Sequence, residues 1–201
     1  MPIDKVRRAA KALEAELIIQ LRWRGGDLDR LVDEGHSFVV GKTLERLRSR
    51  GWEVRTEVSY SIYGERGSID VLAWHEPTRS LLVVEVKTSI VSGEETLRKH
   101  DEKARLAGRI AVEQFGWRAR IVSRLLILPD LSTPRRQVER VATVMHVAYP
   151  DRGVAVREWL ARPAGPVAGI VFLPAIEGPK RGVTGALSRR RVRRRRPTSG
   201  E

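Results

Sequence analysis

The chain has 201 residues, which is enough for one domain with a substantial core and short flanking segments. It contains no cysteine, which excludes disulfides and cysteine-ligated zinc, and no apolar run approaches the roughly 20 residues of a membrane span. The net charge is +13, and the first residues mix acids and bases without the apolar middle of a signal peptide, so we expect a cytoplasmic protein that does not bind membranes.

The first part of the chain predicts two helices. Residues 3 to 22 place apolar side chains along one helical stripe, and two glycines at 25 and 26 end the pattern. We treat residues 1–26 as an N-terminal amphipathic helix outside the main domain. A second helix is expected over about residues 28 to 50, and its inward positions are Val40, Leu44 and Leu47.

Three strands are predicted next. The segment WEVRTEVSY (52–60) alternates as a half-buried strand does, and SIDVLAW (68–74) follows it after the turn YGERG. After the loop HEPTR comes SLLVVEVK (80–87), whose nearly continuous apolar run indicates burial on both faces. A long helix over roughly 94–115 and the buried strand ARIVSRLLILPD (119–130) complete a strand–helix–strand unit. Such a unit implies two parallel neighbouring strands joined by a right-handed crossover.

The C-terminal third is expected to be partly regular. STPRRQVERVATVMHVA (132–148) predicts one helix with a Ser/Thr cap, and GVAVREWL (153–160) predicts an edge strand. The expected fold is therefore α/β, with an αβββαβ core and a mixed central sheet flanked by helices, over residues 27–163. Residues 164–201 are expected to hold a short strand, GIVFLP, and then a disordered Arg-rich tail.

Three charged residues interrupt the apolar pattern. Glu85 and Lys87 lie two residues apart near the end of an apolar strand, so both side chains point to one face. Asp70 lies on the preceding strand, and a hairpin can bring it beside Glu85. Two carboxylates with waters form the oxygen site that Mg²⁺ prefers, and a lysine beside them can orient a water. The alternatives are a turn cap for Asp70 and a surface ion pair of little energetic worth for the other two.

The segments YGERGSIDVLAW and LLVVEVKT, with the strand order around them, resemble the PD-(D/E)XK nuclease superfamily. Within it they are most similar to the YraN-type proteins and the archaeal Holliday-junction resolvases, and the resemblance covers roughly residues 36 to 160. It implies that the αβββαβ core is restriction-endonuclease-like, and that the protein is a metal-dependent phosphodiesterase acting on DNA. Asp70 and Glu85 would bind Mg²⁺ or Mn²⁺ together with the Val86 carbonyl, and Lys87 would assist the attacking water.

The resemblance also implies a contribution from the first helix of the core, where many members carry a glutamate. By helical register the inward positions of this helix are His36, Val40 and Leu44, so no glutamate is among them. His36 is the candidate substitute, ahead of Glu34 and Glu45. The alternative for His36 is an ordinary residue near the start of a helix.

Basic residues form two candidate DNA contacts. Lysines and arginines on the predicted helix over 94–115 can reach phosphates, although a solvated helix face explains them equally well. The tail carries a dense run of arginines, which attracts polyanions but is also explained by a coding bias toward arginine. The candidates are Lys99, Lys103, Arg105 and Arg109 on the helix, and Arg189, Arg190, Arg191, Arg193, Arg194, Arg195 and Arg196 in the tail.

Two functional hypotheses follow from the sequence. The first is a Mg²⁺-dependent DNA endonuclease, selective for branched or damaged DNA in repair and working as a homodimer. The second is a non-catalytic DNA-binding or regulatory protein that keeps the nuclease fold. In both, the tail would associate the protein with DNA in the nucleoid.

Overall fold

The computed structural model describes residues 3–13 and 26–174. The first helix, α1 (Ile3–Ala12), confirms the predicted N-terminal helix over its first half, and residues 14 to 22 of that prediction lie outside the described part. Leu13, on the predicted apolar stripe, is 78% exposed. The Arg-rich tail also lies outside the described residues.

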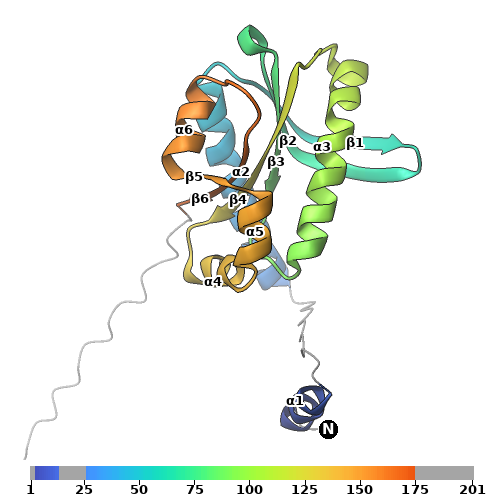
Figure 1. Cartoon of the computed structure of the whole chain (residues 1–201), viewed down its shortest axis with the longest axis vertical. Coiled ribbons are helices and arrows are strands. Elements are labelled where there is room, and N and C mark those ends of the chain that lie inside the picture. The colour runs from blue at the N-terminus through green and yellow to red at the C-terminus, as the bar shows by residue number, and fades with distance from the viewer. Residues whose placement is uncertain (1–2, 14–25, 175–201) are drawn as a thin grey trace, which may run out of the picture.

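A mixed sheet forms the centre of the fold, as the sequence predicts, and it has six strands in the described part of the chain (Figure 1). Its spatial order is β1-β2-β3-β4-β6-β5. The first three strands pair antiparallel, and β3, β4, β6 and β5 pair parallel. The bounds are β1 (Glu53–Ile62), β2 (Glu65–His75), β3 (Ser80–Val86), β4 (Ile121–Pro129), β5 (Asp151–Arg152) and β6 (Ala168–Leu173).

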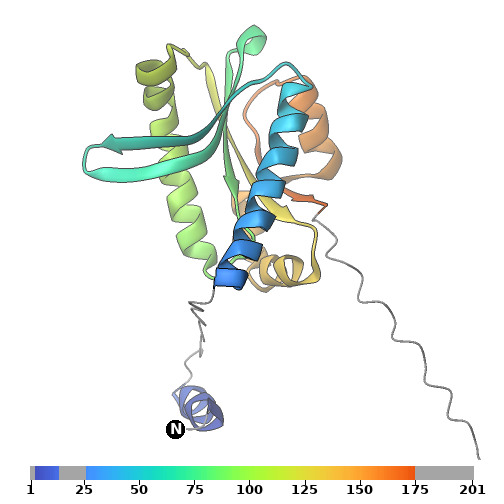
Figure 2. The same cartoon turned by 180° about the vertical axis from the view of Figure 1, so that it is seen from behind.

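Helices cover both faces of this sheet, and Figures 1 and 2 show α2 and α3 on opposite sides of it. The side chains of α2 (Gly26–Arg48) and α6 (Gly153–Ala161) pack on one face, in a cluster that includes Val39, Val84 and Trp159. The opposite face packs against α3 (Gly93–Phe115), α4 (Ser132–Arg140) and α5 (Ala142–Ala148). A 3₁₀ turn, η1 (Glu76–Thr78), connects β2 to β3. The predicted αβββαβ order is therefore observed from α2 to β4.

Strand alternation divides the core between these two layers. In β3 every residue is buried, and Val84 packs toward α2 whereas Val83 packs toward α3. Their partners in β2 follow the same rule, since Val71 opposite Val84 belongs to the first cluster and Leu72 opposite Val83 to the second. The nearly continuous apolar run predicted for this strand is thus explained by helices on both faces.

Two predicted elements are different in the structure. Residues 153–160, predicted as an edge strand, form α6, because Val156 and Trp159 share one helical face and are buried together. The predicted single helix over 132–148 is two helices that break at Val141. No Ser/Thr cap forms there, since Leu131 is the N-cap residue. The predicted short strand is β6, which pairs with β4, so the sheet continues beyond residue 163.

The hairpin formed by β1 and β2 bends toward α3, and the bend occurs at one pair of residues. The ladder pairs Thr56 with Val71 and Val58 with Ile69 but omits the intervening pair, Glu57 and Asp70. Glu57 has a φ of 49°, in the left-handed region that a non-glycine residue rarely adopts. Beyond this pair the hairpin packs against the α3 side, and the long arm is visible in Figures 1 and 2. Asp70 therefore sits where β2 leaves the plane of β3.

Candidate functional site

The structure brings Asp70, Glu85 and Lys87 together, as predicted. Lys87 follows the last residue of β3, and its Nζ lies 2.9 Å from Glu85 Oε1. The pairing of β2 with β3 ends at Val71, and the Asp70 carboxylate then accepts a hydrogen bond of 2.7 Å from the backbone N–H of Val86. The Asp70 side chain thus takes the place of a backbone carbonyl of β2 as the hydrogen-bond acceptor for β3, and it is fixed beside the end of that strand.

Lys103 of α3 completes this cluster. Its Nζ lies 2.5 Å from Glu85 Oε2 and 3.6 Å from Asp70 Oδ1, and its side chain is 11% exposed. Lys103 does not lie on a solvated helix face, because its side chain is buried against the sheet, and its contact with phosphate stays a prediction. The missed signal is its spacing from Thr96, His100 and Ala107, which puts all four on the buried stripe of α3.

The environment separates the two carboxylates electrostatically. Burial, reinforced by the negative charge of Glu85, raises the pKa of Asp70 above its usual range. Burial would also raise the pKa of Glu85, but the ammonium groups of Lys103 and Lys87 outweigh it and hold that pKa below its usual range. Burial lowers the pKa of Lys87, yet its hydrogen bond to Glu85 prevails and raises it. The cluster therefore holds Glu85 as the more firmly ionised of two adjacent acids.

An open cavity of about 430 Å³ borders this cluster. It lies between the start of β2, the end of β3 and α3, where the hairpin diverges from the sheet. The four charged side chains of the cluster form its floor, and its remaining lining mixes basic, acidic and polar residues with one glycine. These are Tyr60, Glu65, Arg66, Gly67, Ser68, Arg98, Lys99 and Glu102.

A buried polar contact holds α3 against the sheet next to the cluster. His100 is fully buried, with one ring nitrogen 3.2 Å from the Val83 carbonyl oxygen and the other 2.7 Å from the Tyr149 hydroxyl. Since the carbonyl only accepts, Nε2 carries the proton and Nδ1 accepts from Tyr149. Burial lowers the pKa of His100 to about 4. Through these two hydrogen bonds a neutral His100 fixes α3 against the sheet. Lys103 lies about one turn later on the same helix, so its position is fixed with it.

His36 lies away from these residues. It is half-buried on α2, and Val39, one turn further along that helix, packs with Val84 and Val86 on the face of β3 opposite Glu85. The first helix of the core faces the sheet as expected, but the cluster is on the other side of the sheet. Glu45 is exposed and pairs with Lys42 at 2.9 Å.

The other predicted DNA contacts of α3 are exposed and form ion pairs. Lys99 pairs with Glu95 at 3.3 Å and also lines the cavity. Arg105 binds Glu65 of the hairpin at 2.6 Å. Arg109 pairs with Glu113 and also lies over the ring of Tyr63 at the tip of the hairpin, 4.8 Å from the ring centroid. The tail arginines, Arg189 to Arg196, lie outside the described residues.

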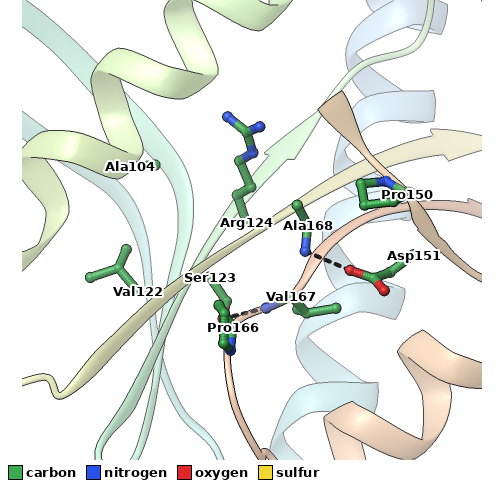
Figure 3. Close-up of a pocket in the computed structure, with 9 residues that line it drawn as sticks. All are labelled: Ala104, Val122, Ser123, Arg124, Pro150, Asp151, Pro166, Val167 and Ala168. Atoms are coloured by element: carbon green, nitrogen blue, oxygen red, sulfur yellow. Dashed lines mark hydrogen bonds between the residues drawn. The ribbon is translucent and has the colours of Figure 1, made fainter. Parts of the chain in front are cut away.

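A second cavity of about 320 Å³ lies at the start of β4 and β6 (Figure 3). Its polar groups are used to attach β6, since Ser123 Oγ accepts from the Val167 N–H and Asp151 accepts from the Ala168 N–H. None of the residues predicted for catalysis lines this cavity. The carboxylate cavity is therefore the better candidate for a functional site.

Comparisons with protein-family models, with curated proteins and with solved structures found no match to this chain. In the described residues, no three histidine, aspartate or glutamate side chains gather into a group that would hold a metal ion alone. Among the helices described, none is both long and apolar enough to cross a membrane.

Proposed function

We propose that this protein is a metal-dependent DNA endonuclease whose active centre is formed by Asp70, Glu85 and Lys87. The observation that carries the proposal is the meeting of two carboxylates and a lysine at the floor of an open cavity, at the point where β2 leaves β3. Burying ionised groups is costly unless they are paired and hydrogen-bonded, and perturbed carboxylates in a cleft are characteristic of functional sites. The resemblance of these segments to the PD-(D/E)XK nucleases supports the same assignment.

The residues present fit a divalent metal ion. Mg²⁺ is commonly bound by one or two carboxylates and completes its shell with waters and substrate phosphates, so Asp70 and Glu85 suffice without a third acid. Val86 adjoins both, with its backbone against the Asp70 carboxylate. When bound, such an ion would polarise the scissile phosphate and lower the pKa of a water.

The chain's own residues supply positioning and charge. Lys87 is 38% exposed at the edge of the cavity and held by Glu85, so its ammonium can orient a water or balance charge on a phosphate. Arg66, Arg98 and Lys99 line the cavity beside Glu65 and Glu102, and Arg98 and Lys99 pair with Glu102 and Glu95. A phosphate backbone would have to compete with these acids for the basic side chains, whose contacts with it would not depend on the base sequence. Branched or damaged DNA, a homodimer and a location in the cytoplasm remain parts of the proposal.

The test is cleavage of supercoiled, linear, single-stranded and four-way-junction DNA with Mg²⁺, Mn²⁺ or EDTA. Asp70→Asn keeps an oxygen for the Val86 N–H but removes the charge that would hold the ion, so cleavage should be lost while the fold and DNA affinity persist. The matched control is Asp130→Asn, which removes an exposed carboxylate paired with Arg135 and should leave cleavage unchanged. Cleavage by Asp70→Asn in EDTA would show that the assignment is wrong.

A second function is favoured by one observation. Lys103 lies between the two carboxylates, and Lys87 pairs with Glu85. The two ammonium groups already neutralise the two carboxylates. A protein that only binds DNA could keep this arrangement as a structural ion cluster. It would bind all the DNA substrates with the same affinity in Mg²⁺ and EDTA and cleave none of them.

A further inference from the structure

Lys103 occupies a distinctive position in the cluster. Its ammonium contacts Glu85 at 2.5 Å and lies 3.6 Å from Asp70, so it stands between the two carboxylates that face the cavity. The side chain reaches this place from α3, across the space between the helix and the sheet. Lys99, one turn earlier on the same helix, is 52% exposed and pairs with Glu95 instead. The burial of Lys103 is thus specific to its position and not a property of the whole helix face.

The charges in the cluster balance without a metal ion. Glu85 and Asp70 together carry two negative charges when ionised, and Lys87 and Lys103 carry two positive charges. A divalent ion placed between the carboxylates would stand in contact with an ammonium and raise the local charge by two. Like charges at such separations repel strongly, even at the effective dielectric constant of about 20 that describes most protein sites. The ion and the Lys103 ammonium therefore exclude each other by charge as well as by space.

We infer that Lys103 is an internal counter-ion that takes the cation position between Asp70 and Glu85, and that a divalent metal ion binds by displacing it. The inference rests on the proposed function in taking these two residues as the metal carboxylates. The cavity of about 430 Å³ gives the displaced side chain room. Glu102, which lines the same cavity and accepts a hydrogen bond from Tyr60 at 2.9 Å, offers the ammonium a new partner.

Metal binding by the full-length chain tests this inference directly. Mn²⁺ titration by calorimetry should give a lower dissociation constant for Lys103→Met than for the wild type. The expected ratio is roughly 5- to 150-fold, which is the change in affinity that typical coupling free energies between two sites produce. Lys42→Met is the matched control, because it removes the same charge from an exposed lysine of α2 that pairs with Glu45 and does not line the cavity, and its affinity should equal that of the wild type. Equal Mn²⁺ affinity in the wild type and Lys103→Met would overturn the inference and leave the proposed function standing. Absence of Mn²⁺ binding in all three proteins would overturn both.

A second measurement uses the wild type and does not depend on the folding of a variant. Acetylation of individual lysines, followed by mass spectrometry, should modify Lys103 slowly without metal and several-fold faster at saturating Mn²⁺. Lys42, which is exposed on α2 and pairs with Glu45, should react at the same rate in both conditions. A Lys103 rate that does not change at Mn²⁺ saturation would show that the ion binds without moving this side chain, and would overturn the inference.

Discussion

At the scale of single residues, the buried histidine is as informative as the charged cluster. His100 is enclosed on all sides and accepts from Tyr149 while donating to the Val83 carbonyl, so its neutral form is fully satisfied. Protonation would convert Nδ1 from an acceptor to a donor facing a hydroxyl group. The charged groups that face it are Glu85, which favours protonation, and Arg124 and Lys103, which oppose it. Burial outweighs all of them.

This environment predicts acid sensitivity. The pKa of His100 is about 4 in the folded protein and about 6.5 when unfolded, so the unfolded chain binds more protons between these values. The stabilisation from a neutral His100 is therefore complete above pH 6.5 and is lost as the pH falls toward 4. The loss amounts to about 3 kcal/mol at most. Urea unfolding at pH 7 and pH 4.5 should show it.

The variant His100→Gln isolates this contribution. It should be less stable than the wild type at pH 7, because the contact with Tyr149 or Val83 is weakened, but its stability should fall less between pH 7 and 4.5. The carboxylates of the cluster titrate in both proteins, so the difference in slope reports His100. Equal slopes would contradict the assignment of a neutral buried imidazole.

At the scale of elements, the two strands of the hairpin carry a second testable feature. Gly67 lies directly opposite Tyr60, whose ring covers it. A Cβ added at residue 67 would stand 2.5 Å from the Tyr60 hydroxyl oxygen and 2.8 Å from Cζ. Because Tyr60 is 7% exposed and donates to Glu102, its ring cannot move away freely. The glycine thus allows the tyrosine to lie flat on the hairpin beside the cavity.

We predict opposite effects for the same substitution at two glycines. Gly67→Ala should destabilise the protein by about 1–3 kcal/mol, the usual cost of overpacking. Gly108→Ala, in α3, should stabilise it by about 0.5–1 kcal/mol, since no atom lies within 4 Å of the added Cβ and alanine favours a helix. Urea unfolding of both variants measures this, and a neutral Gly67→Ala would mean that Tyr60 is not fixed over the hairpin.

The elements with a strong local pattern could be predicted from the sequence. The alternating pattern of β1 and β2 and the apolar run of β3 predict the order of these three strands. The hairpin between β2 and β3 then predicts that Asp70 meets Glu85 and Lys87. The α6 segment was misassigned because a short run with valines at alternate positions fits a strand and a helix equally well. The burial of Lys103 could not be predicted from the apolar residues of α3 alone, because this lysine lies on the buried stripe only through its ion pairs with Glu85 and Asp70.

The face of the sheet that holds the site could not be predicted from the local pattern. The position of His36 depends on which side of the sheet α2 crosses, which is decided by packing of residues far apart in sequence. Val39 meets Val84 and Val86 because these side chains, and not Glu85, point toward α2. Helical register can show that a side chain faces the sheet, but not which ends of which strands it reaches.

At the scale of the whole molecule, charge is distributed unevenly along the chain. Residues 180 to 201 carry nine lysines or arginines and one glutamate, although the net charge of all 201 residues is +13. In the described part of the chain many cations are paired with acids, as Arg105 is with Glu65 and Arg109 is with Glu113. Most of the excess positive charge therefore belongs to the C-terminal segment and not to the carboxylate cavity. This division separates any general attraction to polyanions from the chemistry of the site.

Deleting residues 176–201 tests that separation. Arginines neutralise phosphates by releasing condensed counterions, which strengthens binding without reading bases. We therefore expect the truncated protein to keep its fold and its Mn²⁺ affinity, and to bind all DNA sequences more weakly by about the same factor. Its log–log dependence on salt should flatten by about 0.9 for each phosphate that the arginines had neutralised. Fluorescence anisotropy with duplex and four-way-junction DNA, from low to moderate salt, measures both quantities. An unchanged slope would mean that the arginines do not touch DNA, whereas weaker binding confined to the junction would place the segment in the recognition surface for that structure.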